Sequence, residues 1–485
     1  MMDHYIADDT ICAISTPAGT GGIAVIRVSG PNAIGIVDSV WKGCKLDSVK
    51  SHTAHLGEII DGDNPEEPID QCVATVFRSP NSYTGEDVVE ISVHGSRWIQ
   101  RESIALLMRA GCRMAQPGEY TRRAVMNGRM DLAQAEGVAD IIASSSRAAH
   151  RIAMSQMKGS ISKKLSVLRE QLVQLSVHLE LELDFSEEDV EFADRNRMLY
   201  IADDIISELQ RLHNSFRDGN AIKEGIPVAI IGATNAGKSS LLNALLDDER
   251  AIVSDIHGTT RDTIEETLEI GDYLFRFIDT AGLRDTEDPI EQIGIDRSRR
   301  AISRSVITIF LIDATTLPQS KLDMSFIKDN LPEELLNEPQ DFHNLIIGLN
   351  KIDLLENFST LTDDSRQELS KVNIIDKIPL HSIVPISATQ TIGITHLKQI
   401  LTDIAKANDI SGTDDIIITN LRQAKALKNA IDSIQPLIDG LKNGLDTMLV
   451  AEHLRETISH LSSITGTIPS TEILNTIFSR FCIGK

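Results

Sequence analysis

The sequence predicts a multidomain α/β protein in which a doubly wound domain, built on a mostly parallel sheet, is inserted in an all-α helical domain. Residues 225–408 alternate apolar strands with helical segments, a pattern typical of a parallel sheet covered by helices on both faces. Apolar residues recur at three-to-four spacing from about 131 to 216 and again after about 411. The two helical stretches could therefore form one bundle that the inserted domain interrupts.

The first part of the chain is predicted to be an α+β domain dominated by short strands. Between residues 10 and about 115, four runs are short and rich in Val and Ile, and turn clusters such as Ser79–Ser82 separate them. The predicted strands are Thr10–Pro17, Gly22–Gly30, Ile69–Phe77 and Asp87–His94.

Three helical faces are predicted on either side of the inserted domain. An acidic run at Ser186–Asp194 interrupts the first stretch, and a solvated turn explains this run better than a metal site does. The second stretch has one apolar face before Pro436 and another in a later helix. The three faces carry Leu165, Leu168, Leu172, Leu175 and Leu179; Ala424, Leu427, Ile431 and Ile434; and Leu454, Ile458 and Leu461.

The inserted domain is predicted from its buried strands. The polar stretch Pro318–His343 is expected to be a surface elaboration of this domain. The predicted strands are Val228–Ile231, Phe275–Ile278, Val306–Ile312 and Leu345–Leu349. The predicted domains are 1–126, 127–224, 225–408 and 409–485.

Composition favours a cytoplasmic protein. The formal net charge is −24, so the surface repels a polyanion on average, and nucleic-acid binding would need a local patch or a partner. Five cysteines without a C-x-x-C pair argue against a disulfide framework or a zinc site and for a reducing compartment. The acidic N-terminus lacks the features of a secretory signal, and no apolar run approaches the roughly 18–20 residues of a membrane span.

A phosphate-binding loop follows the apolar run Ile226–Ile231. Gly232–Ser239 reads Gly-x-x-x-x-Gly-Lys-Ser, and between a strand and a helix the backbone N–H groups of such a loop face phosphate oxygens. Lys238 would reach the β and γ phosphates, and the Ser239 hydroxyl would bind Mg²⁺. The expected nucleotide contacts are Asn235, Ala236, Gly237, Lys238, Ser239 and Ser240.

Asn350-Lys351-Ile352-Asp353 follows a predicted buried strand and indicates GTP rather than ATP. A carboxylate at the fourth position, Asp353, accepts hydrogen bonds from both the N1–H and the exocyclic amine of guanine, whereas adenine presents the opposite pattern. Ser387-Ala388 comes after the strand-like run Ile383–Ile386. In this order it fits the loop whose backbone supports the guanine O6.

Two further segments complete the predicted nucleotide site. Asp279-Thr-Ala-Gly282 follows a predicted strand, so Asp279 would hold Mg²⁺ through water and the Gly282 N–H would face the γ phosphate. Gly258–Asp262 contains Thr259 and Thr260, and one threonine there can complete the Mg²⁺ shell. Alone, Thr260 would fit a surface turn equally well, but the order of the other motifs favours the Mg²⁺ role.

The residue after this segment is Leu283 rather than a glutamine that could orient water. The attacking water therefore needs another organiser. Glu291, in the acidic segment Asp285–Glu291, is a candidate, although its spacing alone favours a solvated surface residue.

These motifs resemble the TrmE-type GTPases, a family of tRNA-modification GTPases, over essentially the full chain. In the α/β domain the resemblance rests on Asn235–Asn243, Ala251–Asp262 and Asp279–Arg284. Outside that domain it rests on segments that a generic GTPase would not share, and these decide the family. They are Pro80–Asp87, Gln116–Tyr120 and Phe481–Lys485.

The resemblance implies a K⁺-stimulated GTPase whose GTPase domains dimerise across the nucleotides. Asn235 would bind K⁺ beside the phosphates, where a fixed cation offsets the charge that develops on the β–γ bridge. Backbone carbonyls around Ser254 and Ile256, with Thr259, would complete the K⁺ shell.

The glutamate that is catalytic in the family corresponds to Glu291. The resemblance therefore favours a catalytic role for Glu291 over the solvated surface residue that spacing alone favours. Lys238 and Asn235 complete the implied catalytic set. Thr234 stands where many relatives have Pro, and Ser254 stands where Thr is common. Neither departure removes a required group, because the first lies in a backbone turn and the second would use its carbonyl.

For residues 1–126 the resemblance implies binding of 5-formyl- or 5,10-methylene-tetrahydrofolate at a dimer interface. A carboxylate such as Glu90 can pair with the pterin N–H and amino edge, and Arg27 suits a carboxylate or carbonyl of the ligand. Arg129 stands where some relatives have Lys, so the charge is kept with a different geometry. The fourth position is Lys485. Without the resemblance, each would be interpreted as a surface ion-pair residue.

The resemblance further implies a homodimer that acts on tRNA with an FAD-dependent partner, MnmG (GidA). Together they would add a (carboxymethyl)aminomethyl-type group at C5 of the wobble uridine, while GTP hydrolysis drives opening and closing of the GTPase domains. A regulatory or ribosome-assembly GTPase switch is an alternative, and Pro80–Asp87 and Phe481–Lys485 argue against it. A self-sufficient folate-dependent transferase is another, and the lack of a flavin or nicotinamide fingerprint argues against that one.

Two further features of the sequence allow more than one interpretation. Cys482 has apolar neighbours and no adjacent His, so a buried structural thiol is at least as consistent as a reactive one. A basic cluster could contact RNA or a partner, but a solvated helix face is the better interpretation. The cluster comprises Arg297, Arg299, Arg300 and Arg304.

Overall fold

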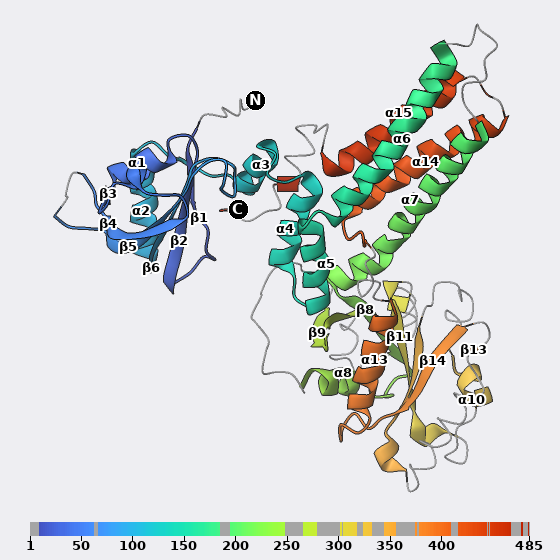
Figure 1. The fold of residues 1–485 in the computed structure, drawn as a ribbon. Coiled ribbons are helices and arrows are strands. Elements are labelled where there is room, and N and C mark those ends of the chain that lie inside the picture. The colour runs from blue at the N-terminus through green and yellow to red at the C-terminus, as the bar shows by residue number, and fades with distance from the viewer. Residues whose placement is uncertain are drawn as a thin grey trace. The chain divides into compact units, whose positions relative to one another are not determined.

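The computed structural model contains two mixed sheets and a set of long helices (Figure 1). Its residue contacts divide the chain into two compact units. The first comprises residues 1–142, 154–210 and 425–485, and the second comprises 143–153 and 211–424. The predicted boundaries at residues 126, 224 and 408 stay predictions. The structure describes residues 9–62, 66–184, 195–247, 265–278, 301–302, 304–317, 324–331, 344–355, 374–375, 378–408, 416–443, 445, 447–466, 477–478 and 484.

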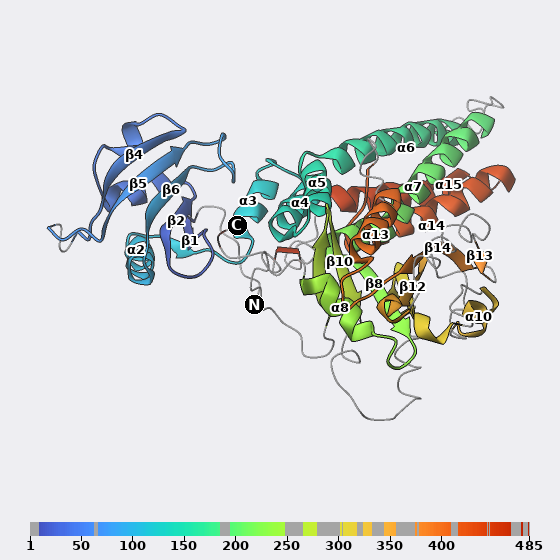
Figure 2. The ribbon, with the colours of Figure 1, turned by 90° about the horizontal axis from the view of Figure 1, so that it is seen from below.

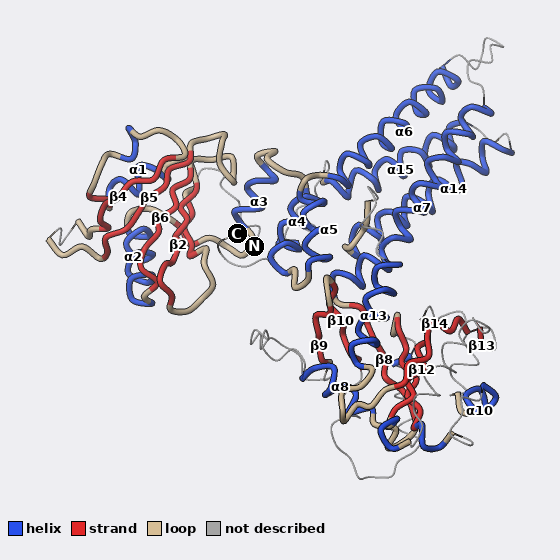
Figure 3. Tube along the Cα trace, turned by 60° about the horizontal axis from the view of Figure 1, so that its bottom comes forward, coloured by secondary structure: helices blue, strands red, loops and turns tan. Residues whose placement is uncertain are grey.

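A mixed sheet begins the first unit (Figure 3). Its strand order is β3-β4-β5-β6-β2-β1-β7, and neighbouring strands are antiparallel except the parallel pair β1 and β7. The strands are β1 Ile11–Ile14, β2 Gly21–Ser29, β3 Trp41–Lys42, β4 Thr53–Ile59, β5 Asp70–Phe77, β6 Val88–Gly95 and β7 Arg113–Met114. The four strands predicted from the sequence are confirmed as β1, β2, β5 and β6.

Two helices cover one face of this sheet. α1 Ala33–Ser39 and α2 Arg97–Arg109 pack against its central strands, and alternate strand residues such as Ile26, Val28 and Ile91 are buried with them. The sequence predicted strands in this region but did not locate α1 and α2. This region also contains two short helices, η1 Leu46–Ser48 and α3 Glu119–Met126.

Strand register brings a row of residues together on the other face of this sheet. Ala54, Thr75, Glu90 and Arg27 lie opposite one another on β4, β5, β6 and β2, and Ala13 of β1 ends the row. Because successive side chains alternate between the faces of a sheet, this row points away from the core under α1 and α2. Arg27 and Glu90 are therefore neighbours by register.

Helices from before and after the inserted domain pack against each other in the first unit. α6 Ser160–Asp184 contacts α15 Thr447–Thr465, and the two lie side by side in Figures 1 and 2. The five leucines predicted to face the core of α6 are buried, with at most 3% of each exposed. The insertion predicted from periodicity is thereby confirmed. Further helices among the described residues outside the α/β domain include α4 Leu132–Ala143, α5 Arg147–Met157, α7 Arg195–Glu224 and α14 Leu421–Asn443.

The helix α14 continues through Pro436 rather than ending before it. Ala424, Leu427 and Ile434 of its predicted face are buried, and so are Leu454 and Leu461 in the later helix, α15. No described helix is both long enough and apolar enough to cross a membrane.

A mostly parallel sheet forms the second unit and confirms the doubly wound prediction. Its order is β13-β14-β12-β11-β8-β10-β9, with parallel pairs from β14 to β10 and antiparallel edges at β13 and β9. The strands are β8 Ile226–Gly232, β9 Glu266–Ile270, β10 Tyr273–Ile278, β11 Ile307–Asp313, β12 Leu345–Asn350, β13 Ile374–Ile375 and β14 Ile378–Pro385.

Separate apolar clusters cover the two faces of this parallel sheet. α8 Lys238–Asp247 and α13 Ile394–Asn408 contribute Leu241 and Leu397 to one cluster. α10 Met324–Asp329 contributes Ile327 to the other. β8, β11 and β12 are neighbouring parallel strands, so their carboxyl ends lie at one edge of the sheet. The short helices η3 Ala314–Thr316 and η5 Ile352–Leu354 follow β11 and β12 at this edge. Ligands of open α/β sheets bind at such an edge.

Candidate guanine-nucleotide site and candidate folate site

The phosphate-binding loop lies where β8 turns into α8. Gly237 has φ +93°, and a Cβ at this position would clash with Nδ2 of Asn350. Lys238 Nζ donates to the carbonyls of Gly232 and Ala233, at 2.9 Å each. Burial lowers the pKa of Lys238 because it disfavours the charged form. A phosphate beside Nζ would counteract this effect by stabilising the charged form. The loop thus presents a cation and close-packed backbone to a phosphate.

Asn350 joins this loop to the predicted base-binding loop. Its Nδ2 donates to the Ala236 carbonyl at 2.8 Å, and its Oδ1 accepts from the Ala388 N–H at 3.1 Å. Only 2% of Asn350 is exposed, so both bonds lie in a region of low dielectric, where losing one partner is costly. The structure therefore brings together three motifs that are far apart in the sequence.

Asp353 in η5 offers an acceptor to a ligand. Its Oδ1 is buried and has no hydrogen-bond partner among the described residues, whereas buried polar atoms are nearly always paired. Ile352, the residue before it, donates its N–H to the Ile386 carbonyl at 3.2 Å, which fixes η5 against the end of β14. Ser387 is fully buried, and its backbone exchanges two hydrogen bonds with Ile392. A carboxylate with a buried, unpaired Oδ1 on a fixed turn fits the two donors of guanine.

Among the other predicted nucleotide residues, Ser239 is partly buried at the start of α8 and Ser240 is exposed. Asn235 is exposed and has a left-handed backbone, with φ +64°. The remaining predicted residues of this site lie outside the described part of the chain. They are Ser254, Ile256, Thr259, Thr260, Asp279, Gly282 and Glu291.

Arg27 and Glu90 form a half-buried ion pair on the N-terminal sheet. The Arg27 Nε and Nη2 atoms lie 2.9 Å and 2.8 Å from Glu90 Oε1, with 15% and 28% of the two side chains exposed. Arg27 Nη1 also donates to the Gly484 carbonyl at 3.3 Å, and Ser15 Oγ donates to the same oxygen at 3.0 Å. Lys485 lies outside the described residues, but its neighbour thus reaches Arg27.

Two tyrosines that the sequence argument did not assign flank Arg27. Its guanidinium lies 5.4 Å from the ring centre of Tyr83 and 5.5 Å from that of Tyr120, within cation–π range. The Tyr120 hydroxyl donates to the Arg27 carbonyl at 2.7 Å. Burial raises the pKa of both tyrosines, so both stay neutral at physiological pH. Both residues fall inside the segments that carried the family resemblance, which is the signal that could have identified them.

Tyr83 also lines an open pocket of about 500 Å³. Arg129 lies on the same pocket, so Tyr83 connects the predicted folate residue Arg129 with the predicted pair Arg27 and Glu90. An aromatic wall with a nearby cation is suited to a heterocycle that carries an anionic tail. The other lining residues are His52, Phe77, Asn81 and Ser82.

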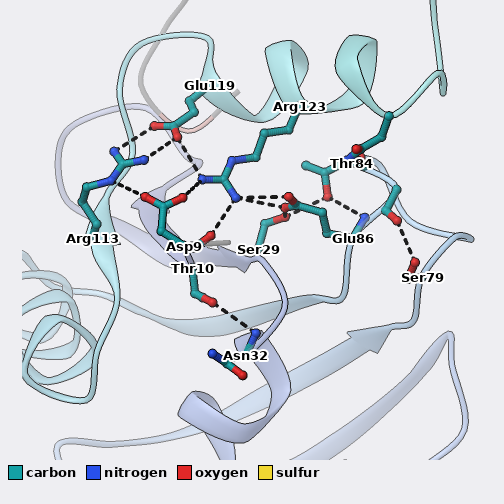
Figure 4. Close-up of polar contacts among 12 residues, drawn as sticks. Asp9, Thr10, Ser29, Asn32, Ser79, Thr84, Glu86, Arg113, Glu119 and Arg123 are labelled. Carbon is teal, nitrogen blue, oxygen red and sulfur yellow. Dashed lines mark hydrogen bonds and ion pairs between the residues drawn. The ribbon is translucent and has the colours of Figure 1, made fainter. Parts of the chain in front are cut away.

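A buried charge network holds the loop that carries Tyr83 (Figure 4). Arg123 contacts Glu86 at 3.1 Å and Glu119 at 3.1 Å, and it also pairs with Asp9. Burial alone would raise the pKa of Glu119, but hydrogen bonds from Arg113, the Gln116 backbone and Arg123 lower it below its ordinary value. Glu86 belongs to Pro80–Asp87 and Glu119 belongs to Gln116–Tyr120. The two family segments therefore meet through one cation.

Two family models match the chain. A model described as the MnmE helical domain matches residues 132–482, and a model described as the GTP-binding protein TrmE N-terminus matches residues 10–129. The first alone spans well over half of the chain.

Bacterial proteins named tRNA modification GTPase MnmE are similar over nearly the whole length. The protein of Parabacteroides distasonis is 47% identical over 481 residues, covering 98% of this chain and 100% of that protein. The protein of Porphyromonas gingivalis is 46% identical over 492 residues, covering 99% of each. The protein of Flavobacterium johnsoniae is 45% identical over 483 residues, covering 99% of this chain and 100% of that protein.

Proposed function

The chain belongs to the MnmE family of tRNA modification GTPases, and we propose that it is a K⁺-stimulated GTP hydrolase that works with the FAD-dependent partner MnmG. The two proteins add a (carboxymethyl)aminomethyl-type group at C5 of the wobble uridine of certain tRNAs in the cytoplasm. The one-carbon unit comes from 5-formyl- or 5,10-methylene-tetrahydrofolate. The observation that supports GTP as the substrate is the buried, unpaired Oδ1 of Asp353 beside a loop network centred on Asn350.

The nucleotide binds along one edge of the parallel sheet in this proposal. Phosphates contact the loop from Asn235 to Ser240, where Lys238 supplies positive charge, and guanine contacts Asp353 and the Ser387–Ala388 loop. The exposed, left-handed Asn235 suits a group that faces a ligand rather than the core. Bound cations offset the negative charge that develops between the β and γ phosphates. Ser239 and Thr260 would hold Mg²⁺, and Asn235, Ser254, Ile256 and Thr259 would hold K⁺.

Glu291→Ala is expected to retain GTP binding but to lower the rate of hydrolysis at least tenfold. The reason is that Leu283 replaces the usual water-orienting glutamine, so the proposal assigns that task to Glu291. Single-turnover GTP hydrolysis, with nucleotide affinity measured separately, checks this. Glu269→Ala removes an exposed glutamate from β9 of the same domain and should leave both quantities unchanged. Near-normal turnover of the Glu291 variant would require another water organiser.

The N-terminal sheet offers a surface for the proposed homodimer. Leu56, two residues along β4 from Ala54, is 67% exposed on the face that carries Arg27 and Glu90. Ile23 at the start of β2 is 69% exposed. Large apolar side chains exposed beside polar groups on a sheet face often mark protein–protein contacts. A second copy on this face would close the folate site from its open side.

Glu90→Gln is expected to weaken tetrahydrofolate binding about tenfold or more. Glutamine keeps the size of the side chain but loses the negative charge that accepts from the pterin N–H and amino edge. Isothermal titration with 5-formyl-tetrahydrofolate measures the change. Glu58→Gln is the matched control, because Glu58 pairs with Lys42 on the same sheet at 3.1 Å and is also 28% exposed. Equal affinity of wild type and the Glu90 variant would remove Glu90 from the site.

The complete reaction tests the proposed function as a whole. Protein, FAD-loaded MnmG, tRNA, GTP, the folate and a nitrogen donor are expected to yield the modified wobble uridine, detected by mass spectrometry of digested tRNA. Ammonium as the donor would give the aminomethyl group, and glycine would give the carboxymethylaminomethyl group. Omission of either GTP or the folate should abolish the product. No modified uridine in the complete mixture, together with no folate binding, would favour the regulatory-switch alternative.

A further inference from the structure

The end of β11 lies beside the guanine motif. β11 and β12 are parallel, and their register places Asp313 opposite Asn350. Both residues close their strands at the same edge of the sheet, and Lys351 follows Asn350 directly. The topology thus brings an acidic residue from outside every assigned motif next to the Asn-Lys-x-Asp turn.

Both oxygens of the Asp313 carboxylate interact with neighbouring residues. Its Oδ2 lies 2.7 Å from Lys351 Nζ, and its Oδ1 accepts from the Thr315 N–H at 3.0 Å and the Thr315 hydroxyl at 2.7 Å. The ion pair is partly buried, with 31% of the Lys351 side chain and 21% of the Asp313 side chain exposed. Burial alone would raise the pKa of Asp313, but Lys351 and Thr315 lower it, so the group is ionised at neutral pH.

Lys351 adopts a backbone conformation that needs support. Its φ is +65°, in the left-handed region that non-glycine residues seldom occupy. This turn sets the direction of the chain between Asn350, which holds the two loops, and Asp353, which offers its carboxylate to the base. A residue that fixes the far end of the Lys351 side chain therefore acts on the shape of the whole turn.

We propose that Asp313 is a positioning residue for guanine-nucleotide binding, which acts by holding Lys351 in its left-handed turn through the ion pair at the ends of β11 and β12. The inference rests on the proposed guanine site. Thr315 orients the carboxylate, the carboxylate orients the Lys351 side chain, and that side chain forms one wall against which the purine ring lies. Asp313 does not touch the base.

This arrangement predicts a particular pattern of kinetic effects. Asp313→Asn keeps the size of the side chain but removes its charge, so KM for GTP is expected to rise about tenfold while kcat at saturating GTP stays within about twofold. Inosine triphosphate lacks the exocyclic amine of GTP. Since Lys351 contacts the ring and not that amine, KM for inosine triphosphate should rise by the same factor.

A double-mutant cycle tests whether Asp313 acts through Lys351. Lys351→Met keeps the apolar stem and removes the charge, and adding Asp313→Asn to it should cause little further loss. Additive effects of the two substitutions on KM would overturn the proposal. Asp272→Asn is the control, because it removes a carboxylate from an exposed ion pair with Arg147 in the same unit, at 3.7 Å.

A further variant, Asp353→Ala, distinguishes an error in the role of Asp313 from an error in the proposed guanine site. If the site is right, this variant discriminates less between GTP and inosine triphosphate, whatever Asp313 does. Unchanged KM in Asp313→Asn with altered discrimination in Asp353→Ala would overturn only the role of Asp313. Unchanged kinetics in both variants would overturn the site itself. An unfolding midpoint equal to that of wild type must accompany any rise in KM that is assigned to positioning.

Discussion

Asp353→Asn is expected to weaken GTP binding about a thousandfold and to make xanthosine triphosphate an accepted substrate. In the proposed site the carboxylate would accept hydrogen bonds from the guanine N1–H and exocyclic amine, whereas an asparagine amide would present a donor to that amine. A site built to hydrogen-bond a substrate group discriminates strongly when the pairing is lost, because buried polar groups are then left unpaired. Xanthine carries a carbonyl in place of the amine, so it pairs with the new amide.

Competition between the two nucleotides measures this switch. Affinity for GTP and for xanthosine triphosphate is compared in the wild type, in Asp353→Asn and in Asp329→Asn. Asp329 is exposed at the end of α10 in the same domain, so its substitution should leave both affinities unchanged. Retained GTP affinity in the Asp353 variant would mean that the unpaired Oδ1 has no part in base recognition.

Arg123→Met is expected to destabilise the N-terminal domain by about 3–5 kcal/mol, the usual cost of removing one partner from a buried ionic group. Arg123 is 7% exposed and faces three carboxylates, of which Glu119 is fully buried. Urea unfolding followed by circular dichroism measures the loss. Arg101→Met is the control, because Arg101 pairs with Glu102 at the surface with 72% of its side chain exposed, and such pairs contribute little.

The same network has a pH dependence whose direction follows from Glu119. The pKa of this carboxyl in the folded protein lies below its ordinary value of 4.5. A group of this kind stabilises the fold above its unfolded pKa, and the contribution is lost as the pH falls through the folded pKa. Wild-type stability should therefore fall below about pH 4.5, and Arg123→Met should lose less over that range. An unfolding free energy of Arg123→Met equal to wild type at pH 7 would contradict the assigned role.

The parts of the fold predicted from sequence are those with strong local patterns. The buried strands around β8, β11 and β12 are continuous apolar runs, and the α6 leucines repeat at helical spacing, so both were predicted. β4 was missed because its exposed residues Ala54 and Leu56 are apolar, whereas the less exposed Thr53 and His55 are polar. Local periodicity does not identify a strand whose outer face carries no regular polar pattern.

The site was predictable where chemistry is encoded in neighbouring residues and not where it depends on tertiary contacts. Lys238 and Asp353 follow from their motifs. The bridge that Asn350 makes between two loops, and the ion pair of Asp313, depend on the register of parallel strands, which no single segment encodes. Arg27 and Glu90 form the ion pair expected of them without the family resemblance, and their folate role stays a proposal. Arg27 lies beside Tyr83, which lines the pocket.

GTP turnover with K⁺ replaced by Na⁺, in the wild type and in Asn235→Ala, tests whether the nucleotide site works as proposed. The wild-type rate is expected to fall at least tenfold in Na⁺, because a K⁺ held by Asn235 offsets charge in the transition state. Asn235→Ala should be slow in both salts and respond little to the exchange. A wild-type rate that is the same in K⁺ and Na⁺ would contradict the K⁺-dependent mechanism.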